Sequence, residues 1–265
     1  MAVLRFMVMG APIAHSLSPM IHRRFAAQTG CDLVYETCLL DEAHFEQQVR
    51  NFFAAGGAGL NITSPGKERA FAMSDIKTPS CLTAGAANTL WINSAGQLCA
   101  DNTDGVGLVR DLNHKGITLA GARILVLGAG GAARGILPAL LDENPLEIIL
   151  ANRTASRAQA LVQALDSTKL KYIPFDAVTG SYDLILNATI STDFSLLHVG
   201  GEPFCYDLNY DASSPTPFVA WAKQAGFKAV DGFGMLVEQA AEAFCVWHGI
   251  RPGMNFPGAS LFQAP

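Results

Sequence analysis

Two polar segments of the chain carry side chains that could exchange a proton. Lys67 closes the segment 61–67, in a loop just past an expected strand at residues 59–63. Asp104 lies in the segment 101–105, directly before an expected helix. Ligands of α/β sheets bind beyond strand ends, so a cation and an anion in two such loops could meet on one substrate as an acid/base pair. Each residue also has an ordinary explanation, because most lysines are solvated and Asp104 could cap the helix.

Three further side chains are placed for binding. Ser16 and Ser18 precede Pro19 at an expected helix start, where free backbone N–H groups favour a small carboxylate. Helix capping by Ser18 would explain that residue and leave Ser16 unexplained. Asn88 places an amide within the small-residue stretch 85–89.

A glycine-rich turn follows the apolar run 124–127. Residues 128–133 read Gly-Ala-Gly-Gly-Ala-Ala and match the G-x-G-x-x-G/A pattern, in which a dinucleotide pyrophosphate lies at a helix N-terminus. The pattern alone is weak, because similar turns also occur for packing. Its place between an expected strand and helix, with a second strand ending near residue 151, strengthens it. The sequence therefore predicts a dinucleotide site.

The residues after that second strand favour NADP. An NAD site offers Asp or Glu to the ribose 2′-hydroxyl, whereas this chain has Asn152, Arg153 and Thr154, with Arg157 one turn beyond. Two guanidinium groups suit a 2′-phosphate. A solvated arginine pair on a surface helix is the alternative explanation, and the glycine turn weighs against it.

The composition excludes several classes of function. The 265 residues include 18 Lys+Arg and 23 Asp+Glu, a net charge of −5, with no basic block to bind nucleic acid or an anionic membrane. No transmembrane segment is expected. The six cysteines form no C-x-x-C pair and suggest the reduced thiols of a cytoplasmic protein. The six histidines form no metal-binding motif, so no metal site is expected.

Expected elements alternate as in an α/β sheet. In the first hundred residues we expect strands at 4–9, 34–40 and 59–63, a helix at 19–29, a second helix capped by Asp41, and a hairpin at 89–92 and 97–100. The helix 105–115 is a candidate hinge. A second series follows, with strands at 123–127, 146–151, 182–187 and 204–208 and a final apolar helix at 235–247.

Seven segments, in order along nearly the whole chain, resemble the shikimate dehydrogenases of aromatic amino-acid biosynthesis. They are residues 10–19, 61–67, 85–90, 102–105, 128–133, 152–154 and 232–239. The resemblance implies a bacterial single-function enzyme that reversibly reduces 3-dehydroshikimate to shikimate with NADPH. It implies two α/β domains, an N-terminal substrate domain with a mainly parallel sheet (1–104 and 238–265) and a Rossmann-type NADP domain (105–237).

The matching motifs also imply a role for each site residue. Lys67 and Asp104 would be the catalytic pair acting at the C3 ketone. The substrate would be bound by Ser16, Ser18, Thr63, Asn88, Tyr210 and Gln239. The cofactor would be bound by Gly128, Ala129, Gly130, Gly131, Ala132, Asn152, Arg153, Thr154, Arg157, Gly232 and Met235. The protein would be a monomer or a homodimer.

Three positions depart from the family pattern. Gly66 replaces the usual phenylalanine before Lys67 and would loosen the lysine, Thr189 is not followed by Ser-Gly, and no proline comes soon after Tyr210. Two rival functions remain open: a quinate/shikimate dehydrogenase using NAD, and a non-catalytic NADPH-sensing protein. The paired arginines disfavour the first rival, and retention of Lys67 and Asp104 disfavours the second.

Overall fold

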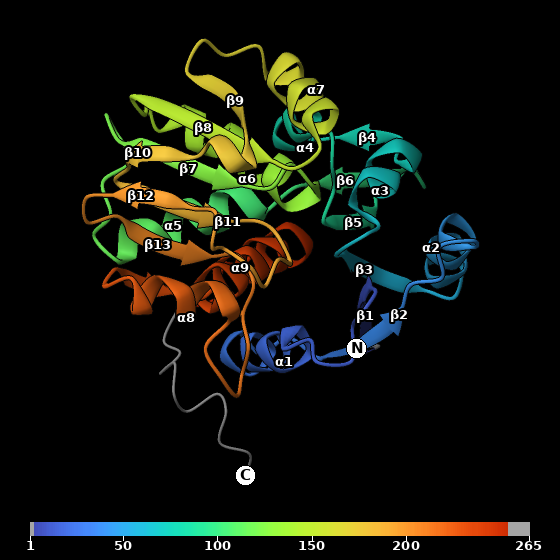
Figure 1. Cartoon of the computed structure of the whole chain (residues 1–265). Coiled ribbons are helices and arrows are strands. Elements are labelled where there is room, and N and C mark those ends of the chain that lie inside the picture. Colours follow the sequence, from blue (N-terminus) through green and yellow to red (C-terminus); the bar gives the residue numbers. More distant parts are fainter. Residues whose placement is uncertain (1–2, 254–265) are drawn as a thin grey trace. The chain divides into compact units, whose positions relative to one another are not determined.

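The structure, a computed structural model, describes residues 3–253 and divides into two compact units (Figure 1). Of the described residues, the first unit comprises 3–107 and 236–253, and the second comprises Leu108–Met235. The expected domain limits, 104 and 238, differ from these by three and two residues. The boundaries of the substrate domain and the NADP domain therefore stay predictions.

The first unit contains a six-stranded sheet in the order β2-β1-β3-β5-β6-β4. Its strands are β1 (Leu4–Gly10), β2 (Leu33–Leu39), β3 (Gly57–Ile62), β4 (Ile76–Lys77), β5 (Thr89–Ile92) and β6 (Leu98–Asp101). Its helices are α1 (Ser18–Thr29), α2 (Phe45–Ala54), α3 (Lys67–Met73), α4 (Pro79–Ala84) and most of α9 (Phe233–His248). Strand β1 is parallel to β2 and β3, whereas β5 is antiparallel to β3 and β6.

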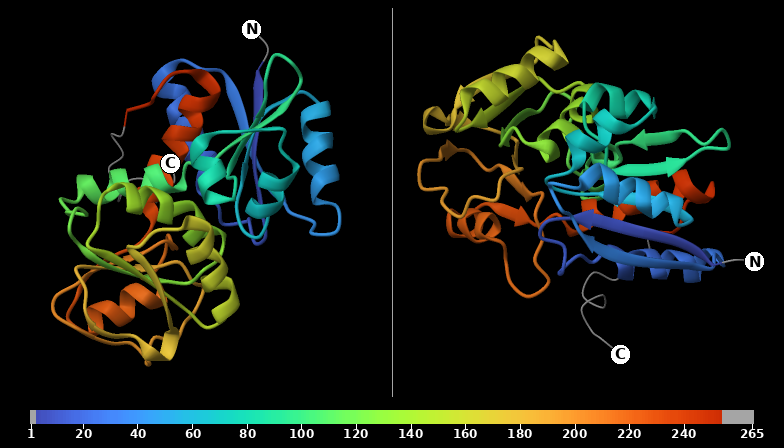
Figure 2. Two further views of the ribbon diagram at one scale, coloured as in Figure 1. Left: turned by 90° about the horizontal axis from the view of Figure 1, so that it is seen from above. Right: turned by 90° about the vertical axis from the view of Figure 1, so that its right-hand side faces the viewer.

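Both faces of this sheet are covered (Figure 2). Successive side chains of a strand point to opposite faces, and β1 follows this rule. Met9 belongs to a cluster with Phe45 and Val49 of α2. Phe6 belongs to a second cluster, against which Trp247 of α9 packs. Burial of both faces explains why β1 reads as a nearly continuous apolar run.

The strand register gathers several loops at one edge of the sheet. Asn61 of β3 lies opposite Thr89, and Thr89 lies opposite Asp101 of β6. The loops after β1, β3 and β6 and the loop before β5 therefore share this edge, because β5 runs in the opposite direction. These loops carry the predicted site residues from Ser16 to Asp104.

The second unit contains a parallel six-stranded sheet in the order β14-β13-β11-β7-β8-β9. Its strands are β7 (Arg123–Leu127), β8 (Glu147–Asn152), β9 (Leu170–Pro174), β11 (Leu184–Asn187), β13 (Phe204–Asp207) and β14 (Lys228–Val230). Its helices are α6 (Gly131–Asp142), α7 (Ala155–Leu165), α8 (Pro217–Gln224) and most of α5 (Asp104–His114); a short helix, Phe175–Ala177, and the pair β10 (Thr179–Ser181) and β12 (His198–Gly200) complete it.

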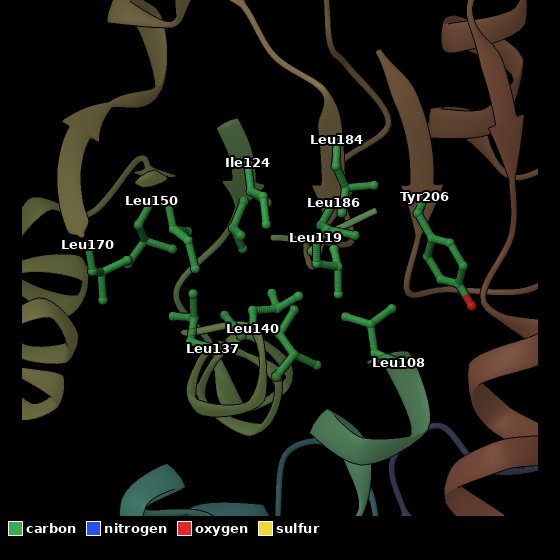
Figure 3. Packing of buried hydrophobic residues seen from close by; sticks show 14 of the residues in the cluster. Leu108, Leu119, Ile124, Leu137, Leu140, Leu150, Leu170, Leu184, Leu186 and Tyr206 are labelled. Atoms are coloured by element: carbon green, nitrogen blue, oxygen red, sulfur yellow. The ribbon is translucent and has the colours of Figure 1, made fainter. Parts of the chain in front are cut away.

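The strand order is that of a dinucleotide-binding sheet. Numbered along the unit it is 3-2-1-4-5-6 from β9 to β14, the doubly wound arrangement in which ligands bind beyond the carboxyl ends of the strands. Leucines and isoleucines of β7, β8 and β11 pack against α6 in the core (Figure 3). The predicted α/β fold with a Rossmann-type sheet is confirmed.

Most predicted elements are present, and two predicted caps are wrong. Asp41 does not cap α2, which begins at Phe45; its carboxylate instead accepts the Ala43 N–H at 2.9 Å. Ser18 is the first residue of α1 rather than its cap, and the hydroxyl of Ser16 accepts the Ser18 N–H at 3.3 Å. No helix within residues 3–253 is long and apolar enough to span a membrane.

Candidate active site

A buried ion pair joins the two segments that the sequence singled out. Lys67 is the first residue of α3, Asp104 is the first residue of α5, and the Lys67 Nζ lies 2.5 Å from the Asp104 Oδ2. The side chains are only 11% and 6% exposed. A buried charged group needs a partner of opposite charge to be tolerated, and each of these side chains is that partner for the other. The ammonium group is therefore fixed beside a carboxylate at the sheet edge.

The backbone around Lys67 is tightly held. Gly66 is buried, and a Cβ at this position would lie 2.8 Å from the Leu40 Cδ1 and 2.9 Å from the Ile62 Cγ2. The carbonyl oxygen of Lys67 accepts the N–H of Ala87 at 2.9 Å. The glycine allows close packing of α3 against the sheet. Whether Gly66 loosens the Lys67 side chain stays a prediction, and this close backbone packing does not support it.

Asn88 links Asp104 to two other polar side chains. Its Nδ2 donates to the Asp104 Oδ1 at 2.8 Å and to the Thr103 Oγ1 at 2.9 Å, and it lies 3.3 Å from the Gln239 Oε1. Its Oδ1 accepts the Thr103 N–H at 2.9 Å. Four predicted residues, Lys67, Asn88, Asp104 and Gln239, thus belong to one hydrogen-bonded cluster. We call these four the polar cluster.

In the second unit, the glycine turn leaves room for a phosphate. Gly128 has φ +102°, and a Cβ there would lie 2.8 Å from the Thr189 Cγ2, so glycine is required. A Cβ on Gly130 would meet nothing within 4 Å. Helix α6 begins at Gly131, and among the described residues no side chain caps it. Its first N–H groups can therefore bind an anion, and the turn fits a pyrophosphate.

The two arginines lie beside this turn. Strand β8 is parallel to β7, and the Gly128 N–H donates to the Ala151 carbonyl at 2.8 Å. Arg153 follows β8 and Arg157 lies in the first turn of α7, and both are exposed. The amide of Asn152 donates to the Thr154 carbonyl at 2.8 Å and shapes the connection between β8 and α7. The donor set fits a 2′-phosphorylated ribose.

Comparison with known proteins identifies the family. A family model described as shikimate dehydrogenase substrate binding domain matches residues 8–90, and one described as shikimate / quinate 5-dehydrogenase matches residues 111–199. The chain belongs to the shikimate dehydrogenase family. It is similar to the shikimate dehydrogenase (NADP(+)) of Alkalilimnicola ehrlichii, with 51% identity over 260 residues and 94% of each chain covered. The enzyme of the same name from Legionella pneumophila is 50% identical over 258 residues, again with 94% of each chain covered.

A solved structure of the same family has the same fold. Shikimate 5-dehydrogenase from Thermus thermophilus, in complex with NADP(H) and shikimate, superimposes with a TM-score of 0.83 at 32% identity and covers 98% of this chain and 97% of its own. The predicted family is therefore confirmed over nearly the whole length of the chain.

Other substrate residues predicted from the shikimate dehydrogenase motifs lie outside the polar cluster. Ser16, Ser18 and Thr63 lie in or after the loops that follow β1 and β3, at the same sheet edge. A Cβ on Gly10 would lie 2.2 Å from the Thr63 Cγ2, so these two loops touch. Within residues 3–253 no hydrogen bond joins the three hydroxyls to Lys67.

Tyr210 lies in the second unit, in the loop after β13. Asp207 organises that loop: its carboxylate accepts from the Asn187 Nδ2 at 2.9 Å, from the Thr216 Oγ1 at 2.6 Å and from the Asn209 N–H at 3.0 Å. Burial raises the pKa of the Asp207 carboxyl above its ordinary value, while these hydrogen bonds act in the opposite direction. The buried Asp207 carboxylate thus holds the loop through these hydrogen bonds, although no proline comes soon after Tyr210.

Sequence reasoning missed three positioning residues. Asn102 accepts the Asp104 N–H at 3.1 Å and donates to the Ala86 carbonyl at 2.8 Å. Asn61 donates to the Asn88 carbonyl at 3.0 Å and accepts the hydroxyl of Tyr35 at 2.6 Å. Asn102 and Asn61 lie in the polar segments 101–105 and 61–67 noted above. The sequence therefore marks both residues as polar groups near the site but does not indicate what they bind. Tyr35 lies in an apolar strand and has no sequence signal. Within the described residues, no group of three His, Cys, Asp or Glu could hold a metal ion.

Proposed function

We propose that this protein catalyses the reversible, NADPH-dependent reduction of 3-dehydroshikimate to shikimate, with Lys67 and Asp104 as its acid/base pair. The observation that supports the proposal best is the buried Lys67–Asp104 ion pair, 2.5 Å between its charged atoms, at a sheet edge shared with hydroxyl and amide groups. Membership of the shikimate dehydrogenase family supplies the substrate class. The reaction belongs to the biosynthesis of chorismate.

The chain's own residues divide the chemistry among them. NADPH supplies the hydride when bound. The ammonium group of Lys67 would donate a hydrogen bond to the C3 carbonyl oxygen, stabilise the negative charge that grows there and deliver a proton. Asp104 would orient Lys67 and accept a hydrogen bond from a neighbouring ring hydroxyl. Asn88 keeps that carboxylate in place through its bond to the Oδ1.

The other predicted residues would bind and orient the two ligands. Ser16 and Ser18 would bind the substrate carboxylate, and Thr63, Asn88, Tyr210 and Gln239 the rest of the substrate. The pyrophosphate of the cofactor would be bound by Gly128, Ala129, Gly130, Gly131 and Ala132. The adenosine end would be bound by Asn152, Arg153, Thr154 and Arg157, and the nicotinamide end by Gly232 and Met235.

We also propose a cytoplasmic location. All six cysteines are free thiols in the structure, as the reducing cytoplasm requires. The proposed partners are the small-molecule substrate and cofactor, without nucleic acid or membrane, and the protein would be a monomer or a homodimer.

The test replaces Lys67 and measures chemistry and cofactor binding separately. Lys67→Ala should lower turnover of 3-dehydroshikimate, followed as NADPH absorbance at 340 nm, by about 100- to 10,000-fold. NADPH affinity, measured by fluorescence titration, should stay within about twofold, because the residues proposed for the cofactor do not include Lys67. Lys77→Ala is the matched control, since Lys77 lies in the same unit and bonds the Ser74 carbonyl away from the polar cluster.

Other results would overturn the assignment. Turnover that survives Lys67→Ala would remove the lysine from its catalytic role. Faster turnover of quinate with NAD than of shikimate with NADP would favour the quinate/shikimate dehydrogenase. NADPH binding by the unchanged protein without turnover of either substrate would favour the sensing protein.

A further inference from the structure

The hydroxyl of Tyr206 joins residues of three elements, and all of these residues lie in the second unit. Tyr206 lies on β13 and is fully buried. Its hydroxyl donates to the Asp111 Oδ2 of α5 at 2.7 Å and accepts the Met235 N–H of α9 at 3.1 Å. Figure 3 shows its ring at the edge of the leucine cluster, with the hydroxyl directed away from the other labelled side chains. A side chain far away in the sequence thus satisfies an N–H in the first turn of α9.

Asp111 is held from the other side as well. Its carboxylate accepts from the Lys115 Nζ at 2.6 and 2.8 Å, one turn further along α5. Burial and the nearby Asp111 charge raise the pKa of Tyr206 well above its ordinary value, so the phenol keeps its proton. A Cβ on Gly234 would lie 2.1 Å from the Asp111 Oδ1. Asp111 and the start of α9 are therefore in direct contact.

The residues that follow β14, up to and including the start of α9, are fixed at several further points. We call residues 231–235 the α9 turn. The Gly232 N–H donates to the Asn209 carbonyl at 2.9 Å, and a Cβ on Gly232 would lie 2.5 Å from the Leu208 carbonyl oxygen. The Phe233 N–H donates to the Asp231 Oδ1 at 3.2 Å. The α9 turn is thus pressed against the loop that follows β13.

The sheet order shows which part of a dinucleotide would reach this turn. The pyrophosphate is proposed at the turn after β7, and the phosphorylated ribose beside β8. Strand β7 lies between β8 on one side and β11, β13 and β14 on the other. A dinucleotide bound beyond the carboxyl ends must therefore extend its second half over β11 and β13, toward the α9 turn.

We propose that Tyr206 and Asp111 are positioning residues for the nicotinamide half of the cofactor, acting through the Met235 N–H and the α9 turn. Neither side chain is exposed enough to touch the ligand, since Tyr206 is fully buried and Asp111 is 5% exposed. They act by holding the backbone of Gly232 and Met235 in one conformation. The inference rests on the proposed binding of NADP.

The experiment compares two ligands on two matched variants. Tyr206→Phe removes the hydroxyl and keeps the ring. Tyr182→Phe makes the same change at another buried tyrosine of this unit, whose hydroxyl donates to the Thr179 carbonyl before β11, away from the α9 turn. Calorimetric titration with NADPH measures the affinity for the whole dinucleotide. Titration with adenosine 2′,5′-bisphosphate measures the affinity for the half proposed to lie beside β8.

The expected result is selective. Tyr206→Phe should weaken NADPH binding by about 5- to 15-fold, as loss of about one hydrogen bond predicts, and should leave affinity for the bisphosphate within about twofold. Tyr182→Phe should change neither affinity. A merely structural role for Tyr206 would weaken both ligands together or neither, and either result overturns the inference.

Two further results are separable. If the unchanged protein binds no NADPH, the proposed function is wrong. If Tyr206→Phe and the unchanged protein bind NADPH with equal affinity, only the proposed role of Tyr206 is wrong. If Tyr206→Phe does not fold, Asp111→Asn replaces it, because the amide keeps the volume of the carboxylate but loses its charge. The same selective loss of NADPH affinity is then expected, and equal loss for both ligands contradicts the proposal.

Discussion

The amide of Asn88 and the carboxylate of Asp104 are joined by a hydrogen bond of 2.8 Å, from Nδ2 to Oδ1. The other carboxylate oxygen, Oδ2, faces the ammonium group of Lys67 at 2.5 Å. Both oxygens of Asp104 thus have a donor, so the plane of the carboxylate is fixed by the start of α3 and by the loop before β5. Such a group is oriented before any substrate arrives, which lowers the reorganisation needed during reaction.

Asp104→Asn should therefore lower turnover strongly. The amide keeps the shape of the side chain but leaves the buried ammonium group of Lys67 without a counterion. We expect kcat to fall by about 100- to 10,000-fold, the range for loss of general acid/base help, with NADPH affinity unchanged. Asp41→Asn, an exposed carboxylate of the same unit, is the control. Turnover of Asp104→Asn within about twofold of the unchanged protein would contradict a catalytic role for this residue.

Tyr35→Phe should show whether a hydrogen bond in the core stabilises the residues that position the polar cluster. Tyr35 is 2% exposed and donates to the Asn61 Oδ1 at 2.6 Å, and Asn61 in turn donates to the Asn88 carbonyl. The variant leaves a buried acceptor unpaired, so we expect a loss of about 1–3 kcal/mol in the free energy of unfolding, measured by urea denaturation. The double variant Tyr35→Phe/Asn61→Leu should then lose less unfolding free energy than the two single variants lose in sum. Its stability should lie close to that of Asn61→Leu alone. Strict additivity would show that the two side chains act independently.

The sequence predicts helices and strands better than it predicts contacts between side chains. β7 was predicted with the bounds that the structure has, because a buried parallel strand is an uninterrupted apolar run. Helix α3 was missed, because its seven residues begin directly at Lys67 and are too few to show a period. The sequence predicted that Lys67 and Asp104 could lie close together, because both residues were expected in loops near strand ends. The bond between Tyr35 and Asn61 depends on register between strands, which no local pattern contains.

Arg153→Ala should reduce the preference for NADP over NAD. The exposed guanidinium follows β8, where the adenosine ribose is proposed to lie, and loss of a charge-assisted bond costs about 1.5–3 kcal/mol. We expect the ratio of kcat/KM for NADP to that for NAD to fall about 10- to 100-fold. Arg50→Ala, on α2 of the first unit, is the control. An unchanged ratio in both Arg153→Ala and Arg157→Ala would mean that these arginines are only surface charges.

His22 should make the protein less stable in mild acid. Its ring is fully buried and stacks on the ring of Tyr35, with centroids 4.2 Å apart and planes 10° apart. Within residues 3–253 neither ring nitrogen has a hydrogen-bond partner. Burial, with a smaller effect from His248, lowers the pKa of His22 from 6.5 to about 3. The folded protein therefore keeps this imidazole neutral at a pH where the unfolded chain protonates it.

The sign of the pH dependence follows from this difference. Between about pH 6.5 and pH 3 the unfolded chain binds a proton that folded His22 does not, so stability falls as the pH falls, by at most ~1.4 kcal/mol per pH unit. His22→Phe keeps an aromatic ring against Tyr35 and removes this proton. Urea denaturation at pH 7, 6 and 5 should give a shallower loss of unfolding free energy in His22→Phe than in the unchanged protein. Some slope should remain, because burial also lowers the pKa of His248. The exposed His15→Phe should keep the original slope, and an equal slope in His22→Phe would show that His22 is not the group that resists protonation.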